Sequence, residues 1–351
     1  MSDRAEAFAR RLDRDWIVTV TRREGGKLAS RRVMQLALTR ERPDIVYVFD
    51  LAVSGVAAAM WHKIRTGVPF VIDTGDAITA LARQGGRRGL VGVAATAGLE
   101  RAGLAAAAHV VVRGSAHRAW MADRGITASV IPDGVDTKVF APRDRNSARA
   151  ALRWPQTFTV TILGSSVWNP RLKMAYGWDL VDLLAQLTDL PVRGVLIGDG
   201  TGIERIRSLA ESRGVSDRLH FAGRQPLATL PDYLAASDVC LSTQSNDLVG
   251  QVRTTGKLPL YMASGKYILA SDVGEASRVL PREMLVPYSG ARDDEYPSRL
   301  AERVRALVAN PARLDAGLAN VDVARREFDY DVLAGRVDRV MQDVIVPERS
   351  V

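Results

Sequence analysis

Several residue types and patterns are scarce in this 351-residue sequence, and each scarcity excludes a class of protein. A single cysteine, Cys240, excludes a disulfide framework and a zinc site built from cysteines, and it predicts a reducing, cytoplasmic setting. Four dispersed histidines argue against a multi-histidine metal centre. The longest apolar runs, residues 51–61 and 102–112, reach about half of the roughly 20 residues that a membrane-spanning helix needs. The charged start, MSDRAE, lacks the apolar segment of a secretory signal.

The composition that is present is that of a folded, globular protein. Hydrophobic residues make up 47% of the chain and charged residues 25%, and the length suits two domains of roughly 150–200 residues each. The charge is uneven, because residues 1–150 hold 24 Lys and Arg against 15 Asp and Glu, whereas residues 151–351 hold 24 against 25. A basic first half indicates an anionic partner for that half, or else an Arg-rich surface that reflects genome composition.

Short apolar runs alternate with helical patterns along the chain. Most of the runs are continuously apolar and rich in β-branched residues, as in strands buried on both faces of a parallel sheet. This alternation predicts a doubly wound α/β fold. The expected strands are Trp16–Thr21, Ile45–Phe49, Phe70–Ile72, His109–Val112, Ser129–Ile131, Thr157–Leu163, Val192–Ile197, Leu219–Phe221, Val239–Leu241 and Tyr267–Ala270. The expected helices include Val53–Arg65, Ser115–Ala122, Lys173–Leu187, Ile203–Arg213 and Leu227–Ala236.

A turn and a polar linker divide the two α/β halves. Residues 132–136 read PDGVD, which is turn chemistry, and residues 141–146 read APRDRN. We expect one Rossmann-like domain over residues 1–145 and a second over 146–330, facing each other across a cleft. A terminal helix over residues 331–351 is expected to pack back toward the first domain.

The turn carries the first family signal. Residues 131–136 read IPDGVD and residues 140–142 read FAP. The pattern resembles the interdomain hinge of the GT-B glycosyltransferases, in particular the retaining family 4 (glycosyl transferases group 1), with Asp133 in place of the usual Asn. The alternative is an ordinary Pro-Asp-Gly turn. The resemblance implies two Rossmann-like domains and transfer of a sugar from a nucleotide-sugar donor to an acceptor hydroxyl, with retention of configuration. The acceptor would be a glycan, a lipid-linked molecule or a small molecule. No metal or cofactor is implied beyond the nucleotide sugar.

Two glycine-containing turns resemble parts of the family's donor site. Gly198 and Gly200 end a strand and open a helix, where glycine permits a close backbone approach to a ligand. Residues 221–224 read FAGR and resemble a turn that faces the nucleotide base. Arg224 in this turn is either a donor contact or a solvated surface charge.

A more specific segment is residues 254–267, TTGKLPLYMASGKY. Thr255 and Gly256 open a short helix, where unpaired N–H groups favour an anion, and Lys257 adds a cation. The segment is similar to the family pattern S/G-K-L-x-E-Y-M-A-x-G-x-P, which implies a role in holding the donor diphosphate. The family has a pair of acidic residues in this region. Leu260 replaces the glutamate within the segment, and the upstream acidic position of the pair falls near Val252 or Arg253, neither of which is acidic. Glu275 or Asp247 is a candidate replacement, and a core helix capped at Gly256 is the alternative reading.

The loop after the strand at 157–163 reads GSSVWNPRLK. In the family this loop supplies a basic pair that neutralises the pyrophosphate, in place of a metal. Gly164 and Ser165 stand at its start, with Ser165 in the position of the usual Arg. We therefore expect Arg171 and Lys173 to supply the charge, surface basicity being the competing explanation.

Three carboxylates in the first half follow expected strands. Asp50, Asp73 and Asp76 stand at or near strand ends, which lie at the ligand-binding edge of a parallel sheet. The segment VIDTGD resembles the family's acceptor side, which makes Asp73 or Asp76 a candidate for orienting or deprotonating the acceptor hydroxyl. Asp73 is equally well read as a helix N-cap, and His109 is expected to be a structural histidine.

The start of the chain departs from the family pattern. Family members begin with a strand and a Gly-Gly loop near the donor phosphates, whereas here a helical pattern over residues 5–12 precedes the expected strand at 16–21. We therefore expect the family's first strand-loop unit to be missing from this sequence, either because the start is placed too far downstream or because the protein is a reduced member.

A basic, apolar segment suggests a further partner. Residues 83–92 read RQGGRRGLVG, and Arg87 and Arg88 stand beside an apolar stretch, a combination that suits peripheral contact with an acidic membrane at its inner face. A solvated loop explains the segment equally well. Two other readings of the whole chain stay open: a catalytically inactive GT-B partner or regulatory subunit, and a basic nucleic-acid-binding protein. No nucleic-acid module is recognisable, so no nucleic-acid partner is expected.

Overall fold

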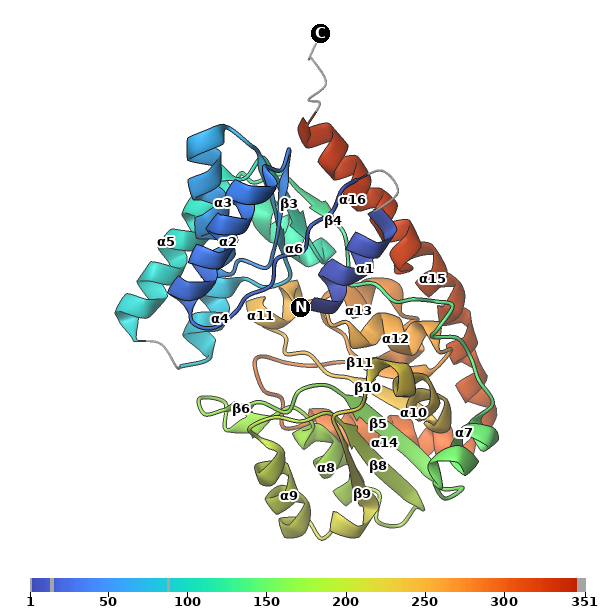
Figure 1. Cartoon of the computed structure of the whole chain (residues 1–351). Helices are drawn as coiled ribbons and strands as arrows, with labels where there is room; N and C mark the ends of the chain where they lie inside the picture. The colour runs from blue at the N-terminus through green and yellow to red at the C-terminus, as the bar shows by residue number, and fades with distance from the viewer. Residues whose placement is uncertain (1, 13–15, 87–88, 346–351) are drawn as a thin grey trace. The chain divides into compact units, whose positions relative to one another are not determined.

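The computed structural model describes residues 2–12, 16–86 and 89–345, and these divide into two compact units (Figure 1). Unit 1 comprises residues up to Gly134, residues 251–254 and residues from Asp329. Unit 2 comprises Val135–Gly250 and Thr255–Phe328. The helix α16 (Tyr330–Ile345) therefore belongs with the first unit, and the change of unit falls at 134/135.

Unit 1 is built on a parallel sheet whose strands follow one another in chain order. Its strands are β1 (Val46–Phe49), β2 (Phe70–Thr74), β3 (His109–Val112) and β4 (Ala128–Val130), each paired with the next. Because parallel crossovers are right-handed, strands added in this order place their connecting helices on one face. Those helices are α3 (Val53–Thr66), α4 (Ile78–Gln84), α5 (Leu90–Ala106) and α6 (Ser115–Ala122), and α2 (Lys27–Glu41) packs on α3.

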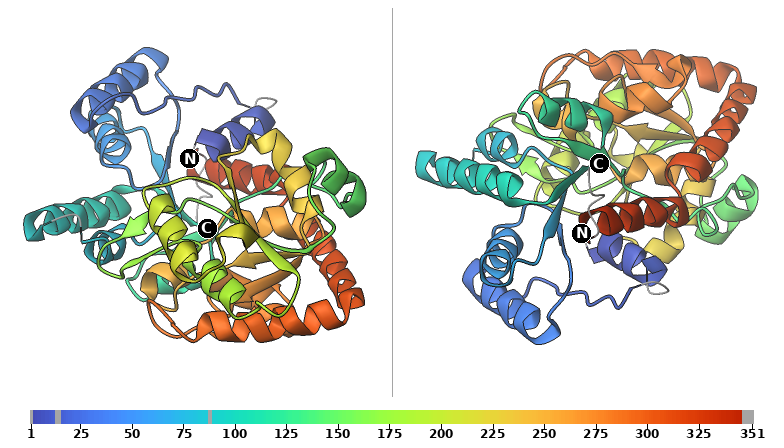
Figure 2. Two further views of the ribbon diagram at one scale, coloured as in Figure 1. Left: turned by 90° about the horizontal axis from the view of Figure 1, so that it is seen from below. Right: turned by 90° about the horizontal axis from the view of Figure 1, so that it is seen from above.

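The two faces of this sheet have different covers. Phe70 and Ile72 point to the face that α3, α5 and α6 cover, whereas Val71 points to the opposite face. The second face is covered by α1 (Ser2–Leu12) and α16, which contact each other although they come from opposite ends of the chain (Figure 2). Trp16 reinforces this pairing, because its indole N–H donates to Asp338 at 2.7 Å.

Unit 2 contains a larger parallel sheet with the strand order of a dinucleotide-binding fold. The order is β12-β11-β10-β5-β8-β9. The chain adds β8 and β9 on one side of β5 and then β10, β11 and β12 on the other, so the strand order reverses between β5 and β10. Ligands of such sheets bind outside the carboxyl ends of the strands at this reversal. The strands are β5 (Phe158–Leu163), β8 (Val192–Ile197), β9 (Leu219–Gly223), β10 (Val239–Ser242), β11 (Tyr267–Ser271) and β12 (Leu285–Val286).

Helices and a small hairpin complete unit 2. The antiparallel hairpin β6 (Trp168–Asn169) and β7 (Met174–Ala175) follows β5. The helices are α7 (Arg145–Leu152), α8 (Trp178–Ala185), α9 (Ile203–Ser212), α10 (Leu230–Ala236), α12 (Lys257–Ala263), α13 (Gly274–Val279), α14 (Tyr296–Ala309) and α15 (Asn320–Glu327). The helix α11 (Leu248–Val252) contains the change of unit at 250/251, and 3₁₀ turns occupy Ser216–Arg218, Leu227–Thr229, Arg282–Met284 and Pro311–Ala319.

Two of the expected elements are wrong. Residues 16–21 form no strand; they are extended but pair with no described strand, and the Ile17 side chain is fully exposed. The helix expected over Lys173–Leu187 begins only at Trp178. Lys173 adopts a left-handed φ of 51° and Gly177 one of 103°, and both conformations end a right-handed helical path. No helix in the described part of the chain is long and apolar enough to cross a membrane.

Candidate functional sites

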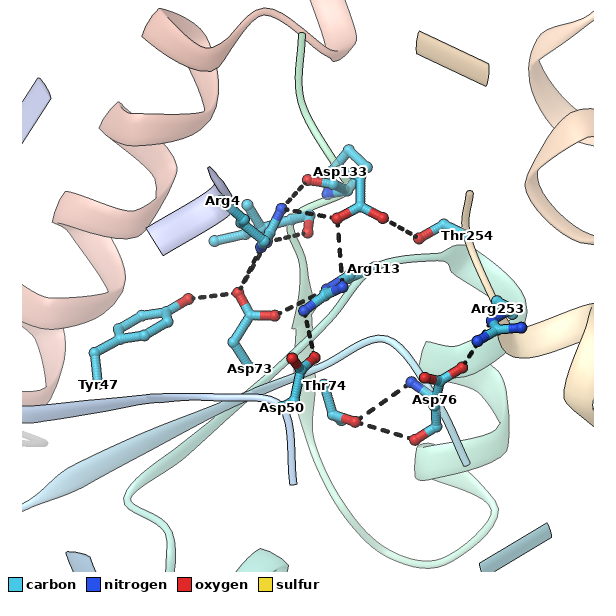
Figure 3. Close-up of polar contacts among 12 residues, drawn as sticks. Arg4, Tyr47, Asp50, Asp73, Thr74, Asp76, Arg113, Asp133, Arg253 and Thr254 are labelled. Carbon is cyan, nitrogen blue, oxygen red and sulfur yellow. Dashed lines mark hydrogen bonds and ion pairs between the residues drawn. The ribbon is translucent and has the colours of Figure 1, made fainter. Parts of the chain in front are cut away.

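Charged side chains gather at the carboxyl edge of the unit 1 sheet, where the four parallel strands end together. Asp50 follows β1, Asp73 is in β2, Arg113 follows β3 and Asp133 follows β4 (Figure 3). Arg4 reaches the same edge from α1. Parallel strands bring these residues together because their carboxyl ends share one edge of the sheet.

Asp73 is the centre of this cluster and is fully buried. Its Oδ2 accepts hydrogen bonds from Arg4 at 2.8 and 3.1 Å and from the Tyr47 hydroxyl at 3.1 Å. Its Oδ1 accepts from Arg113 at 3.2 Å. Both oxygens are thus engaged by protein groups. Asp73 lies within β2 and so is no helix N-cap, which corrects that alternative reading.

The two arginines bind the surrounding strand ends together. Arg4 also donates to the main-chain carbonyls of Ile131 and Pro132. Arg113 pairs with Asp50 at 2.6 Å and with Asp133 at 3.4 Å. Burial alone lowers the pKa of Arg113, but the carboxylates around it outweigh burial and raise that pKa. Both guanidinium groups therefore stay charged.

Asp50 differs from Asp73 in having an unused oxygen. Its Oδ2 is buried and accepts no hydrogen bond from the described residues, and its backbone adopts a left-handed φ of 57°. Burial raises the pKa of Asp50, with the neighbouring carboxylates of Asp73 and Asp76 adding to the effect and Arg113 opposing it. A carboxylate with a free oxygen and a raised pKa has the properties of a proton acceptor.

Asp76 is more open and pairs with a residue distant in sequence. Its Oδ1 lies 3.0 Å from Arg253 Nε, and both side chains are partly exposed. Arg253 is one of the two residues, with Val252, that stand near the position where the family pattern has an acid. Arg87 and Arg88, the other residues nominated for the acceptor side, lie outside the described residues.

Sequence reasoning missed His117 beside this edge. His117 is fully buried in α6, and neither ring nitrogen has a partner among the described residues. Burial lowers its pKa to about 4, with the nearby Asp76 opposing the shift. Arg113 was also missed, although its place after an apolar strand is the signal that identified Asp50. Nothing in the sequence marks Arg4.

In unit 2, two loops meet at the carboxyl ends of β5 and β8. Gly164 N–H donates to Ile197 O at 3.0 Å, and Ser166 N–H donates to Asp199 O at 2.8 Å. The contact is backbone against backbone, because a Cβ on Gly198 would lie 2.0 Å from Gly164 O and one on Gly200 would lie 2.6 Å from Ser166. Both glycines have φ values open mainly to glycine, 139° and 148°.

Lys257 joins this loop pair from the start of α12. Its ammonium group donates to the Tyr176 hydroxyl and lies 3.8 Å from the centre of the Tyr176 ring. A Cβ on Gly164 would lie 3.7 Å from the same nitrogen, so Lys257 stands beside the first loop. Thr255, two residues earlier, has a buried hydroxyl without a hydrogen-bond partner in the described structure, although the residue makes other contacts. The site combines glycine backbone, hydroxyls and one cation.

The remaining nominated donor residues take different positions. Ser165 and Gly256 are exposed, and Arg224 is exposed after β9. Glu275 is buried and pairs with Arg278. Arg171 lies in the hairpin turn between β6 and β7, and Lys173 lines a separate groove described below. Among the described residues, no group of three or more His, Cys, Asp or Glu is arranged to hold a metal ion.

Comparison with known proteins agrees with this architecture. Residues 158–310 match the family model described as glycosyl transferases group 1. D-inositol 3-phosphate glycosyltransferase from Segniliparus rotundus is 30% identical over 217 residues, which cover 58% of this chain and 44% of the relative. A GDP-mannose-dependent alpha-(1-6)-phosphatidylinositol dimannoside mannosyltransferase from Mycobacterium tuberculosis is 28% identical over 195 residues, covering 54% and 46%. The chain thus spans under half the length of these curated relatives.

Solved structures extend the likeness to both units. Sucrose-phosphate synthase from Thermosynechococcus elongatus superposes with a TM-score of 0.74 at 19% identity, covering 90% of this chain and 77% of that one. At this identity the likeness shows the fold. The chain has the GT-B fold, with two Rossmann-like domains. The match of residues 158–310 to the group 1 glycosyltransferase model agrees with the family resemblance seen in the sequence.

Proposed function

We propose that this protein is a glycosyltransferase that moves a sugar from a nucleotide-sugar donor to an acceptor hydroxyl. The observation that carries the proposal is the Gly164–Gly198–Lys257 arrangement at the strand reversal of unit 2. The glycines let the loops after β5 and β8 pack backbone against backbone at the carboxyl ends of the strands, and Lys257 beside them supplies a cation for the charge that develops on the leaving diphosphate. The relatives named for inositol-phosphate and GDP-mannose chemistry support this class of reaction.

The donor site would use the residues nominated from the sequence. Gly164, Ser165, Gly198 and Gly200 would approach the phosphates through their backbone, while Thr255 and Gly256 would add hydroxyl and N–H donors. Lys257 would neutralise charge, with Arg171, Lys173, Arg224 and Glu275 as further candidates. We propose a retaining reaction that needs no metal, in which these cationic and N–H groups stabilise the leaving diphosphate.

For the acceptor we propose the edge of the unit 1 sheet. Asp50 is best suited to accept the proton of the attacking hydroxyl, since its Oδ2 is unused and its pKa is raised. Asp76 would orient the acceptor together with Arg253. Asp73 would position Arg4 and Arg113, because its own oxygens are already engaged. The acceptor would be a glycan, a lipid-linked molecule or a small polyol.

We further propose contact with acidic membranes through unit 1, at the inner face of the membrane. Residues 17–42 hold seven Lys and Arg against two acids. Within this range Leu28 is 81% exposed and Leu36 is 64% exposed, while Leu90 at the start of α5 is 91% exposed. Basic residues interleaved with exposed leucines suit anionic headgroups and shallow insertion. Flotation with anionic but not zwitterionic vesicles would support this contact, and loss of flotation is expected for Leu28→Ser with Leu36→Ser.

The donor proposal is tested by thermal shift. UDP, GDP, ADP, dTDP and their sugars are screened with and without Mg²⁺, since a ligand that binds the native state raises the melting temperature. We expect one nucleotide to raise it without metal, and Lys257→Met to reduce that shift. Arg207→Met, an exposed cation elsewhere in unit 2, is the matched control. The same nucleotide sugar then enters transfer assays, where Asp50→Asn is expected to lower kcat.

One observation favours a second candidate, a GT-B protein without catalytic activity. Leu260 stands where the family pattern has one glutamate, Val252 or Arg253 stands near the position of the other, and Arg253 pairs with Asp76. If no nucleotide shifts the melting temperature, a partner or regulatory role replaces the enzyme proposal. Nucleotide binding without transfer to any acceptor would support the same role.

A further inference from the structure

A groove in unit 2 shares a single residue, Lys173, with the residues nominated for the donor site. It has a volume of about 450 Å³ and is formed by the β6–β7 hairpin, α8 and α9, with one residue from the loop before α14. This volume is in the range of small-molecule sites. Gly164, Gly198 and Lys257 are not among the residues that line it.

The lining of the groove is strongly basic. Its basic residues are Lys173, Arg205, Arg213 and Arg292, against a single acid, Asp182. Asp182 is already paired with Arg213 at 2.7 Å. Arg292 is paired with Asp294 at 2.8 Å. Arg205 and Lys173 form no ion pair with any residue that the structure describes. The groove therefore presents two cations that no acidic residue of the described structure neutralises.

Two tryptophans hold two of the groove's four cations in fixed orientations. The Arg205 guanidinium lies 4.1 Å from the centre of the Trp168 ring, and that of Arg292 lies 4.8 Å from the Trp178 ring. Arg292 already donates to Asp294 and to the hairpin backbone, whereas the stacked Arg205 keeps its N–H edges available and loses less freedom on binding than a mobile side chain. Such edges match the oxygens of a phosphate, which accept paired hydrogen bonds.

The backbone of the hairpin is also fixed by these groups. Arg292 donates to the main-chain carbonyls of Leu172 and Lys173 at 3.3 and 3.0 Å. Lys173 is thereby held in its left-handed conformation on the groove wall. Cations from the hairpin and from α9 thus face one cavity while belonging to separate elements.

We propose that this groove is a second binding site, distinct from the donor site, that takes the phosphate group of a small phosphorylated molecule. The inference does not rest on the proposed function, because the groove binds phosphate whether or not the protein transfers a sugar. The surplus of cations selects an anion, and two cations without an acidic partner on separate walls of the groove, Arg205 and Lys173, favour a multiply charged phosphate over a singly charged carboxylate.

Calorimetric titration with pyrophosphate tests the proposal, using two arginines of the same helix. Arg205 and Arg207 both lie on α9 and both stack on an aromatic ring, Arg207 at 4.0 Å from the Phe221 centre, but only Arg205 lines the groove. We expect Arg205→Gln to weaken groove binding about tenfold or more, because a charged hydrogen-bonding partner is lost. Arg207→Gln is expected to change it less than twofold. Equal effects of the two variants would overturn the proposal.

Lys257→Met separates the groove from the donor site. The wild-type protein is expected to bind two pyrophosphate ions, Arg205→Gln and Lys257→Met one each, and the double variant none with comparable affinity. If Lys257→Met still binds two pyrophosphate ions, the proposed donor site is contradicted and the proposed groove site is not. Unchanged binding in Arg205→Gln would overturn the groove. Lys173→Asn, which tolerates the left-handed backbone, provides a second variant from the opposite wall.

Two probes then identify the source of the phosphate. Glucose 1-phosphate represents a soluble ligand, and vesicles containing phosphatidic acid represent a lipid headgroup. The ligand is soluble if glucose 1-phosphate competes with pyrophosphate, and if this competition is lost in Arg205→Gln but kept in Arg207→Gln. The ligand is a lipid headgroup if flotation with the vesicles is lost in Arg205→Gln but kept in Arg207→Gln. Failure of both probes to compete would overturn the proposal of a phosphorylated small molecule.

Discussion

Asp73 and Asp76 are three residues apart, yet their side chains meet different surroundings. Asp73 is fully buried between Arg4 and Arg113, whereas Asp76 is partly exposed and pairs with a single, half-exposed Arg253. Removing one member of a buried ion network leaves uncompensated charge in a poorly solvated place, while an exposed pair contributes little. The two carboxylates should therefore differ in what they do for the protein.

We expect Asp73→Asn to lower the free energy of unfolding of unit 1 by about 3–5 kcal/mol. Asp76→Asn should lower it by less than about 1 kcal/mol. Urea denaturation of both variants measures the difference. A similar stability for the two variants would contradict the positioning role of Asp73.

His117 makes the stability of unit 1 depend on pH. Its pKa is lowered to about 4 in the folded protein, against about 6.5 in an unfolded chain. Between these values the unfolded state binds a proton that the folded state does not, so stability is complete above about pH 6.5 and falls as the pH decreases toward 4. The loss sums to roughly 3 kcal/mol over this range.

We expect His117→Leu to flatten the pH dependence of unfolding between pH 7 and pH 4.5. His109→Gln is the comparison variant: burial lowers the pKa of His109 as well, but His109 is less buried and its ring bonds to the Ser129 hydroxyl at 2.9 Å. Urea midpoints at several pH values measure the slopes. A wild-type slope retained in His117→Leu would assign the pH dependence to other groups.

At the scale of elements, one nominated position requires glycine and another does not. Gly198 follows β8 with a φ of 139°, and a Cβ there would lie 2.0 Å from Gly164 O. Gly256 precedes α12 with a φ of −55°, and a Cβ there would have no heavy atom within 4 Å. The first glycine holds two loops together, whereas the second occupies open space.

We therefore expect Gly198→Ala to destabilise unit 2 by about 2 kcal/mol or more, through strain and backbone displacement, and to weaken nucleotide binding. Gly256→Ala should be neutral or stabilise by up to about 1 kcal/mol, since the alanine restricts the unfolded chain. Thermal unfolding with and without the nucleotide checks both. Equal destabilisation by the two substitutions would show that the loop contact does not govern this site.

Most of the strands were predictable, because a strand buried on both faces leaves a continuous apolar run such as Val192–Ile197. The run at 16–21 misled because strand propensity is local, whereas a strand exists only where a partner is in register. The hairpin β6–β7 was missed because two-residue strands leave no periodic signal. The positive φ of Lys173, which precludes a continuous helix there, has no sequence signature.

The sites were predictable only where strand ends or the family pattern mark them. Asp50, Asp73 and Gly198 were nominated because each follows or ends an apolar run, and Lys257 was nominated because its segment resembles the family pattern. Arg4 was not, because its partner Asp73 is 69 residues away and only the packing of α1 on the sheet joins them. His117 was overlooked since a buried histidine in a helix resembles any core residue.

At the scale of the whole molecule, the two units carry different charge and different proposed tasks. The basic surplus lies in the first half of the chain, while the glycine loops and Lys257 lie in unit 2. A nucleotide that binds at the strand reversal of unit 2 should slow the hydrogen exchange of the backbone amides near that site and leave the amides of unit 1 unchanged. Hydrogen exchange resolves such effects, because local opening is slowed where a ligand binds the closed form.

We expect the nucleoside diphosphate that raises the melting temperature to slow amide exchange in peptides covering Gly164–Ser166 and Gly198–Gly202, by tenfold or more at saturation. Peptides covering β2 of unit 1 should exchange at unchanged rates, and Lys257→Met should remove the protection at matched ligand concentration. Protection centred on the hairpin and α9 instead would place the nucleotide in the basic groove. Protection confined to unit 1 would move the donor to the Asp50 edge and reverse the tasks proposed for the two units.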